Sequence, residues 1–77
     1  MENKIIKILN EIRPNFDFKK SNNFIEDGML DSFDVINLVT ILDADFGVFI
    51  DGMDILPENF SSSIKICQLL MKNGAKE

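Results

Sequence analysis

Few residues of this 77-residue chain could carry out chemistry by themselves. The sequence contains no histidine, which removes the commonest general base, the Ser–His and Cys–His nucleophile pairs and the usual zinc ligands. Cys67 is the only cysteine, so neither an internal disulfide nor a cysteine metal cluster can form. Its helical spacing from Ile64 and Leu70 favours a buried structural thiol over a reactive one. We therefore expect that this protein is not an enzyme.

The pair Asp31-Ser32 is the strongest candidate for a functional site. It lies directly before a helical pattern of apolar residues, and either residue could cap that helix by accepting a bond from a free backbone N–H. A serine at this place is exposed, and an anionic group attached to it would lie near the positive end of the helix macrodipole. A simple capping role for Ser32 is the alternative.

Closely spaced acidic residues raise the question of a calcium site. The EF-hand loop needs oxygen ligands at alternate positions, glycine at the sixth position and glutamate at the twelfth. Counted from Asp43, the sixth residue is Val48 and the twelfth is Asp54. The sequence therefore predicts no specific metal site.

Charge is distributed unevenly along the chain. The net charge is −5, and no lysine or arginine lies between Lys20 and Lys65. The nine acidic residues of this stretch are Glu26, Asp27, Asp31, Asp34, Asp43, Asp45, Asp51, Asp54 and Glu58. Such a surface would repel nucleic acid and anionic lipid and attract basic partner proteins. A purely solubilising role is the alternative.

The elements that must position Asp31-Ser32 follow from hydrophobic periodicity. A first helix is predicted to end near Arg13, because Pro14 disfavours a helical conformation of the residue before it. Its apolar stripe is Ile5, Ile8, Leu9 and Ile12. Residues 14–30 form a long connection that we expect to be packed onto the core. The residues that would pack it are Phe16, Phe18, Phe24 and Ile25.

A second helix is predicted from Asp31-Ser32 to Gly47, which is a good terminator. Its core stripe is Val35, Leu38, Val39, Leu42 and Phe46. A neighbouring face carries Phe33, Ile36, Asn37 and Thr40.

The last third of the chain is predicted to hold one short helical turn and a third helix. Residues 48–50 are read as an extended, buried connection, and Asp51 as the cap of a turn that Pro57 breaks. One of the serines 61–63 caps the third helix, which Asn73-Gly74 closes. Its core stripe is Ile64, Cys67, Leu70 and Met71, flanked by Ile66 and Leu69. The fold class is all-α, a small bundle of three main helices plus one short helix in a single domain spanning residues 1–77.

Residues 24–34 read Phe-Ile-Glu-Asp-Gly-Met-Leu-Asp-Ser-Phe-Asp and resemble the prosthetic-group site of acyl carrier proteins. The Asp-Ser pair before a large apolar residue, the preceding Phe-x-Glu-Asp and the acid two positions after the serine carry the resemblance. It continues to Phe46 and Ile50 and includes the helix order and chain length. Fatty-acid carriers usually have Leu-Gly-x before the Asp-Ser pair. Gly28-Met29-Leu30 is instead similar to D-alanyl carriers and to stand-alone biosynthetic carriers.

The resemblance implies that Ser32 receives 4′-phosphopantetheine from coenzyme A. The thiol of this arm would hold an acyl or aminoacyl group as a thioester, so the carrier needs no base of its own. Asp31 would contact the phosphopantetheinyl transferase or its metal ion. The cargo and the pathway are not specified by the sequence. The apolar residues that could shelter a cargo, which ordinary core packing explains equally well, are Val35, Val39, Leu42, Ile50 and Ile64.

Enzymes that load and unload the thioester are the other expected partners, and they would dock through basic surfaces. The expected docking face is Phe33, Ile36, Asn37 and Thr40, with charge from Asp34 and Asp43; extra core packing is the alternative for these side chains. We expect a monomer that binds no nucleic acid. No apolar run approaches 20 residues, so we expect no insertion into membranes, and the N-terminus does not look like a signal peptide, so we expect a cytoplasmic protein. The alternative function is an unmodified acidic interaction module.

Overall fold

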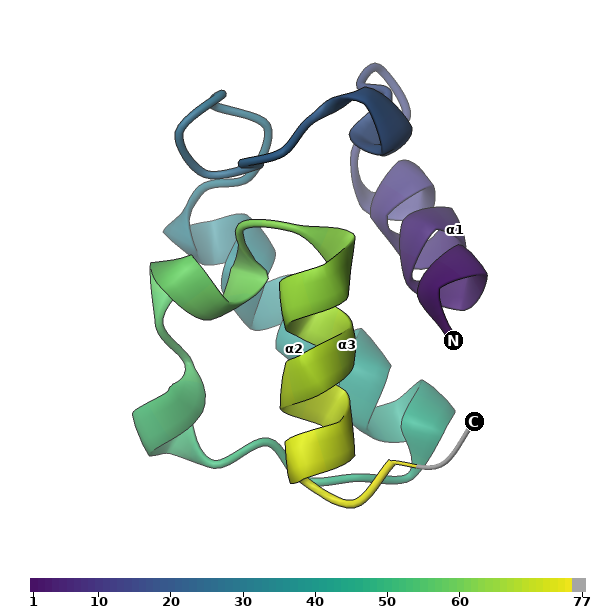
Figure 1. The fold of residues 1–77 in the computed structure, drawn as a ribbon, viewed down its shortest axis with the longest axis vertical. Coiled ribbons are helices and arrows are strands. Elements are labelled where there is room, and N and C mark those ends of the chain that lie inside the picture. The colour runs from purple at the N-terminus through teal and green to yellow at the C-terminus, as the bar shows by residue number, and fades with distance from the viewer. Residues whose placement is uncertain (76–77) are drawn as a thin grey trace.

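The protein is described here by a computed structural model covering residues 1–75, while residues 76 and 77 lie outside the described part of the chain. It contains three α-helices, α1 (Glu2–Ile12), α2 (Ser32–Phe46) and α3 (Ser63–Lys72), and three short 3₁₀ helices (Figure 1). These are η1 (Phe18–Lys20), η2 (Gly52–Asp54) and η3 (Pro57–Phe60). No strand occurs in the described residues. The predicted all-α fold with three main helices is confirmed.

Helix α1 packs against both α2 and α3. It buries Ile5, Ile8 and Leu9 of the predicted stripe together with Ile6, whereas Ile12, the last residue of that stripe, is half-buried. Arg13 is its C-cap, and the backbone N–H of this residue donates to Leu9 O at 2.9 Å. Pro14 follows, and the helix ends where the sequence predicted.

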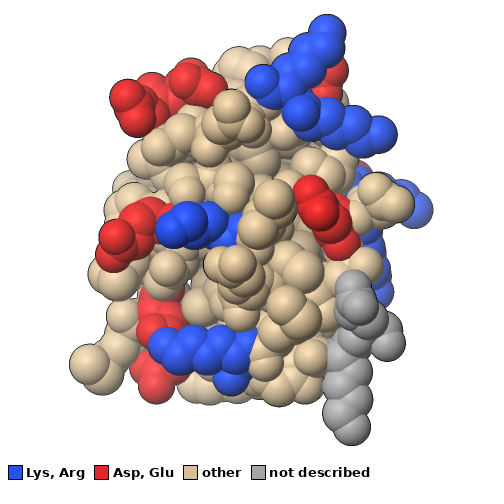
Figure 2. Space-filling model, viewed as in Figure 1, with Lys and Arg blue, Asp and Glu red and all other residues tan. Residues whose placement is uncertain are grey.

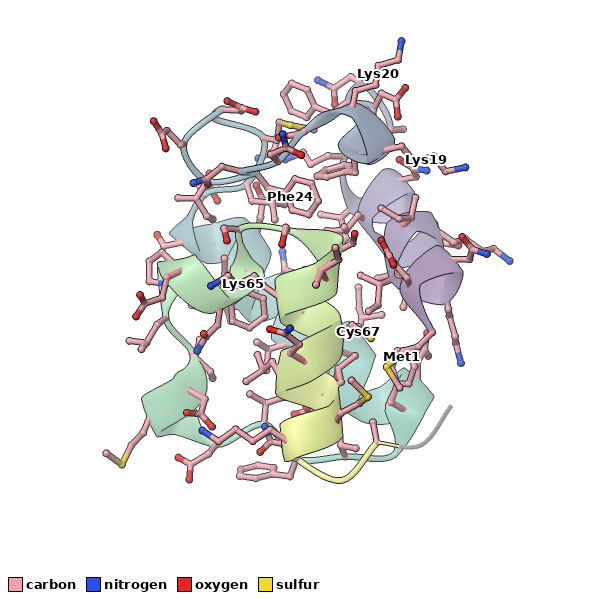
Figure 3. The ribbon with its side chains drawn as sticks, viewed as in Figure 1. Met1, Lys19, Lys20, Phe24, Lys65 and Cys67 are labelled. Carbon is pink, nitrogen blue, oxygen red and sulfur yellow. The ribbon has the colours of Figure 1, made fainter. Side chains whose placement is uncertain are left out.

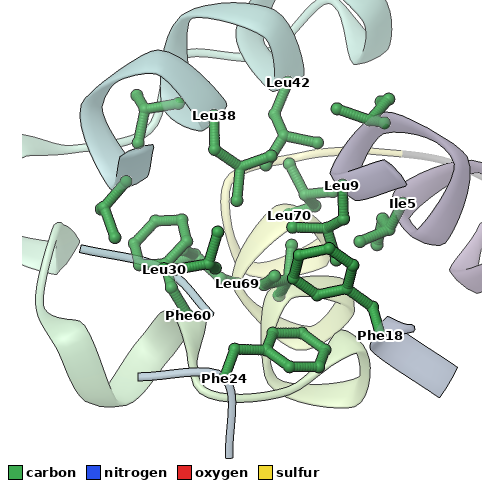
Figure 4. Close-up of a cluster of buried hydrophobic side chains, with 14 of the residues drawn as sticks. Ile5, Leu9, Phe18, Phe24, Leu30, Leu38, Leu42, Phe60, Leu69 and Leu70 are labelled. Carbon is green, nitrogen blue, oxygen red and sulfur yellow. The ribbon is translucent and has the colours of Figure 1, made fainter. Parts of the chain in front are cut away.

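The long connection after α1 passes over one end of the bundle to reach the start of α2 (Figure 1). Phe18 and Phe24 are fully buried, and their rings meet edge to face with centroids 5.0 Å apart (Figure 4). The N–H of Phe24 donates to Ser61 O at 2.7 Å, which joins this connection to the segment before α3. The prediction that aromatic residues pack this connection onto the core is confirmed, and η1 within it was not predicted.

Helix α2 begins and ends as predicted. Val35, Leu38, Val39 and Leu42 are buried, whereas Phe46 is half-buried beneath the ammonium of Lys4, 4.8 Å from the ring centroid. Gly47 has φ of 64°, the left-handed conformation that glycine adopts readily, and its N–H donates to Asp43 O.

The segment between α2 and α3 differs from the prediction in two ways. Of residues 48–50 only Ile50 is buried, and the side chain of Phe49 is 81% exposed. The connection alternates in and out of the core because it is extended, so Phe49 points away from the side that buries Ile50. Asp51 caps the short turn η2 as expected, but Pro57 begins η3 rather than only ending a helix.

The predicted core stripe of α3 is correct only at Leu70, and the residues predicted to flank it lie in the core instead. Ile64 and Met71 are 58% and 49% exposed and Cys67 is half-buried, whereas Ile66, Leu69 and Leu70 are buried. Helix α3 packs between α1 and η3, and those two elements select the face that the sequence placed at the flank. Cys67 faces Met1, with their sulfur atoms 3.4 Å apart (Figure 3).

Candidate functional site at the start of helix α2

Ser32 is the first residue of α2 and is exposed to solvent. The sequence left the cap open between Asp31 and Ser32, and the structure assigns it to Asp31, whose side chain accepts from the N–H of Asp34. Within residues 1–75, no hydrogen bond involves the hydroxyl of Ser32. Ser32 therefore does not cap α2, which was the alternative to modification of its hydroxyl.

The first turn of α2 is closed by a reciprocal capping box. Asp31 Oδ1 accepts from Asp34 N at 2.9 Å, and Asp34 Oδ2 accepts from Asp31 N at 3.2 Å. Val35 N donates to Asp31 O at 3.0 Å as the first bond of the helix ladder. Ser32 lies between the two acids, so the box fixes the backbone that presents its hydroxyl.

Arg13 from the end of α1 completes this arrangement. Its Nε and Nη2 atoms lie 3.0 and 2.8 Å from Asp34 Oδ2, and Nη2 also lies 3.7 Å from Asp31 Oδ2. Arg13 was not predicted as a site residue, because it lies 21 positions from Asp34 in the sequence. Asp31 and Asp34 lie three positions apart at the start of α2, and this spacing was the only signal in the sequence that a cationic side chain would be placed beside them.

Asp34 corrects the predicted docking set. It is only 4% exposed, and its carboxylate bonds within the protein, so it cannot supply charge to a partner surface. Burial alone raises the pKa of Asp34, but the hydrogen bonds from Arg13 and from the backbone of Asp31, together with the Arg13 charge, outweigh burial and hold that pKa below its ordinary value. The bond to Asp34 in turn raises the pKa of Arg13.

The other predicted docking residues are placed as follows. Phe33 and Ile36 are 70% and 61% exposed, and Asn37 and Thr40 are exposed beside them. Core packing, the alternative for these four, does not apply in this structure. Asp43 is half-buried and its Oδ1 accepts from Ile50 N at 3.2 Å, so part of its carboxylate is used at the end of α2.

A hollow of about 180 Å³ lies beside the serine. Its lining is mainly apolar, from Val35 and Ile36 on α2 and Ile55 and Pro57 on the opposite segment, with Ser32 at its edge. The sequence did not indicate that residues 55 and 57 reach this place. A larger hollow of about 490 Å³ is lined by the connection before α2, by η3 and by Lys65 of α3, and Pro57 borders both hollows. Ile64, one of the predicted shelter residues, is exposed and lines neither of these two hollows.

The surface is less uniformly acidic than the sequence stretch indicated. Cationic and anionic side chains lie near one another on the face that α3 forms (Figure 2). Lys72 Nζ lies 3.0 Å from Asp54 Oδ1, so α3 compensates part of the acidic middle of the chain, as Arg13 does at Asp34. In residues 1–75, no group of three or more potential metal-ligating side chains comes together.

Comparisons with models of protein families, with curated proteins and with solved structures gave no match. The interpretation of the site therefore rests on its residues and their geometry. No helix within residues 1–75 has the length and apolar character needed to cross a membrane.

The lowered pKa of Asp34 predicts how stability depends on pH. Because the folded state holds this carboxyl in its charged form, the stabilisation is present above the ordinary carboxyl pKa of about 3.9 and is lost as the pH falls through the lower folded value. Asp34→Asn should reduce the free energy of unfolding by about 1–2 kcal/mol at neutral pH, and this loss should become smaller as the pH falls below the ordinary carboxyl pKa of about 3.9. Urea unfolding followed by circular dichroism measures the loss at each pH.

Asp45→Asn is the control, since it removes an exposed carboxylate from the last turn of the same helix. A loss of stability in Asp34→Asn that is equally large at neutral pH and below the ordinary carboxyl pKa would contradict this account of the ion pair.

Proposed function

We propose that this protein is a carrier that holds an acyl or aminoacyl group on a 4′-phosphopantetheine arm attached to Ser32. The observation that carries the proposal is the free, exposed hydroxyl of Ser32 at the first residue of α2, in a turn that Asp31 and Asp34 already close. Residues 24–34, which resemble the attachment site of acyl carrier proteins, support it.

The start of α2 suits a phosphodiester. The N–H groups of Ser32 and Phe33 belong to the first turn and have no intrahelical acceptor, and the helix macrodipole is positive at this end. Attachment joins Ser32 Oγ to the phosphorus of the phosphopantetheine half as the pyrophosphate bond of coenzyme A breaks. Adenosine 3′,5′-bisphosphate is the leaving group, and the hydroxyl proton leaves to a base of the transferase. When bound, the arm supplies the thiol that carries the thioester.

Asp31 is proposed to contact the transferase or its metal ion. Its side chain is 64% exposed although one oxygen caps the helix. Only Oδ1 is used for the cap, and Oδ2 is 3.7 Å from Arg13, so a carboxylate oxygen next to Ser32 is accessible to an incoming enzyme.

Partner enzymes are proposed to dock on Phe33, Ile36, Asn37 and Thr40, which continue from Ser32 along one face of α2. Apolar side chains exposed to this degree next to an attachment site are suited to transient contacts with a partner enzyme. Basic residues on the partner's surface would steer it toward this acidic protein. The hollow beside Ser32 offers an apolar surface to the first atoms of the arm. We propose a cytoplasmic monomer; the cargo is left to the loading enzyme.

Conversion by a transferase tests the attachment site. Incubation with coenzyme A, magnesium and a broad-specificity phosphopantetheinyl transferase should add one phosphopantetheine to the wild type and none to Ser32→Ala, as read from intact mass. Ser63→Ala is the matched control, because Ser63 is the first residue of α3 as Ser32 is of α2. This control should still be modified.

No mass gain in folded wild type, repeated with a second transferase, would overturn the carrier proposal. The same surface would then be interpreted as an unmodified acidic module that binds a basic partner.

A second substitution tests the docking face. Ile36→Ala should lower kcat/KM for the transferase roughly three- to tenfold, because exposed apolar side chains at the centre of an interface carry much of its binding energy. Ile64→Ala, on α3, is the control, since Ile36 and Ile64 are exposed to a similar degree, 61% and 58%. Equal rates for the two variants would exclude Ile36 from the docking surface.

A further inference from the structure

One carboxylate oxygen at the start of α2 contacts three nitrogen atoms. Asp34 Oδ2 receives Arg13 Nε, Arg13 Nη2 and the backbone N–H of Asp31 at 3.0, 2.8 and 3.2 Å. The first two bonds come from α1 and the third belongs to the capping box that encloses Ser32. A change at Arg13 therefore acts directly on the backbone that presents the serine.

Arg13 is itself held by α1. Its N–H bonds to Leu9 O at 2.9 Å, and Leu9 is fully buried in the core. The guanidinium thus links the end of α1 to the first turn of α2 through one hydrogen bond and one ion pair to the same oxygen of Asp34. The Arg13 side chain remains 40% exposed, so it is also accessible from solvent.

The contact between Arg13 and Asp34 also changes the charge around Ser32. Asp31 and Asp34 flank the serine, and the phosphate donor that approaches it is an anion. Among residues 1–75, Arg13 is the only cation within 4.0 Å of either carboxylate. Without it, two uncompensated carboxylates would oppose the donor, and one of them would be buried.

We propose that Arg13 is a positioning residue for the modification of Ser32: it fixes the capping box and neutralises Asp34, so that the transferase meets a preorganised serine next to the exposed carboxylate of Asp31. This inference rests on the proposed function of Ser32. It adds a residue from the end of α1 to a site that the sequence places wholly at residues 24–34.

The test is the rate of modification of four folded variants by one transferase, with circular dichroism confirming the helical content of each. Arg13→Gln should lower kcat/KM by roughly tenfold or more, the effect expected for loss of a charge-assisted hydrogen bond that orders the site. Arg13→Lys, which keeps the charge, should recover part of the rate. Arg13→Gln combined with Asp34→Asn should also recover, because an amide oxygen at position 34 accepts from Asp31 N without needing a cation.

Lys7→Gln is the control for loss of one positive charge from α1, and it should be modified at the wild-type rate. A wild-type rate for folded Arg13→Gln would overturn the inference, and so would a slow Arg13→Gln that neither Arg13→Lys nor the added Asp34→Asn restores. Failure of the proposed function is distinguishable from both, since the wild type itself would then gain no mass.

Discussion

The fold places a buried carboxylate, that of Asp34, between the end of one helix and the beginning of the next. A buried carboxylate is stable only when its oxygens are hydrogen-bonded and its charge is compensated. Arg13 supplies the charge, and the N–H of Asp31 supplies a further donor. Because both donors reach the same oxygen, the direction of α1 and the conformation of the first turn of α2 are fixed together. The exposed hydroxyl of Ser32 is presented by that turn.

The rest of the chain keeps these two helix ends in place. The connection from Arg13 to Asp31 is long, and it is ordered by Phe18 and Phe24, which lie edge to face in the core, rather than by regular structure. Phe60 of η3 is fully buried, and η3 packs against both α2 and α3. A small domain with a limited core can in this way hold a surface site rigid without a cleft. This arrangement suits the proposed carrier function, in which an attached group and partner enzymes would supply the chemistry.

Local patterns in the sequence predicted the three helices, a cap at Asp31 or Ser32, the terminator Gly47 and the aromatic packing of residues 14–30. Each of these depends on residues close together in the chain. On helix α3 only Leu70 of the predicted stripe is buried, because Leu70 fits a helical stripe with Ile64, Cys67 and Met71 as well as one with Ile66 and Leu69, and only the positions of α1 and η3 decide between them. The pairing of Arg13 with Asp34 could not be predicted for a similar reason, since it joins distant positions through the tertiary fold.

The most direct test of the account is to locate the attached group. The protein should be incubated with coenzyme A, magnesium and the transferase, then digested and sequenced by fragmentation mass spectrometry. The account predicts a single phosphopantetheine on Ser32, with the other serines and Cys67 unmodified. A group found on another residue, or no attached group on a folded protein, would contradict it.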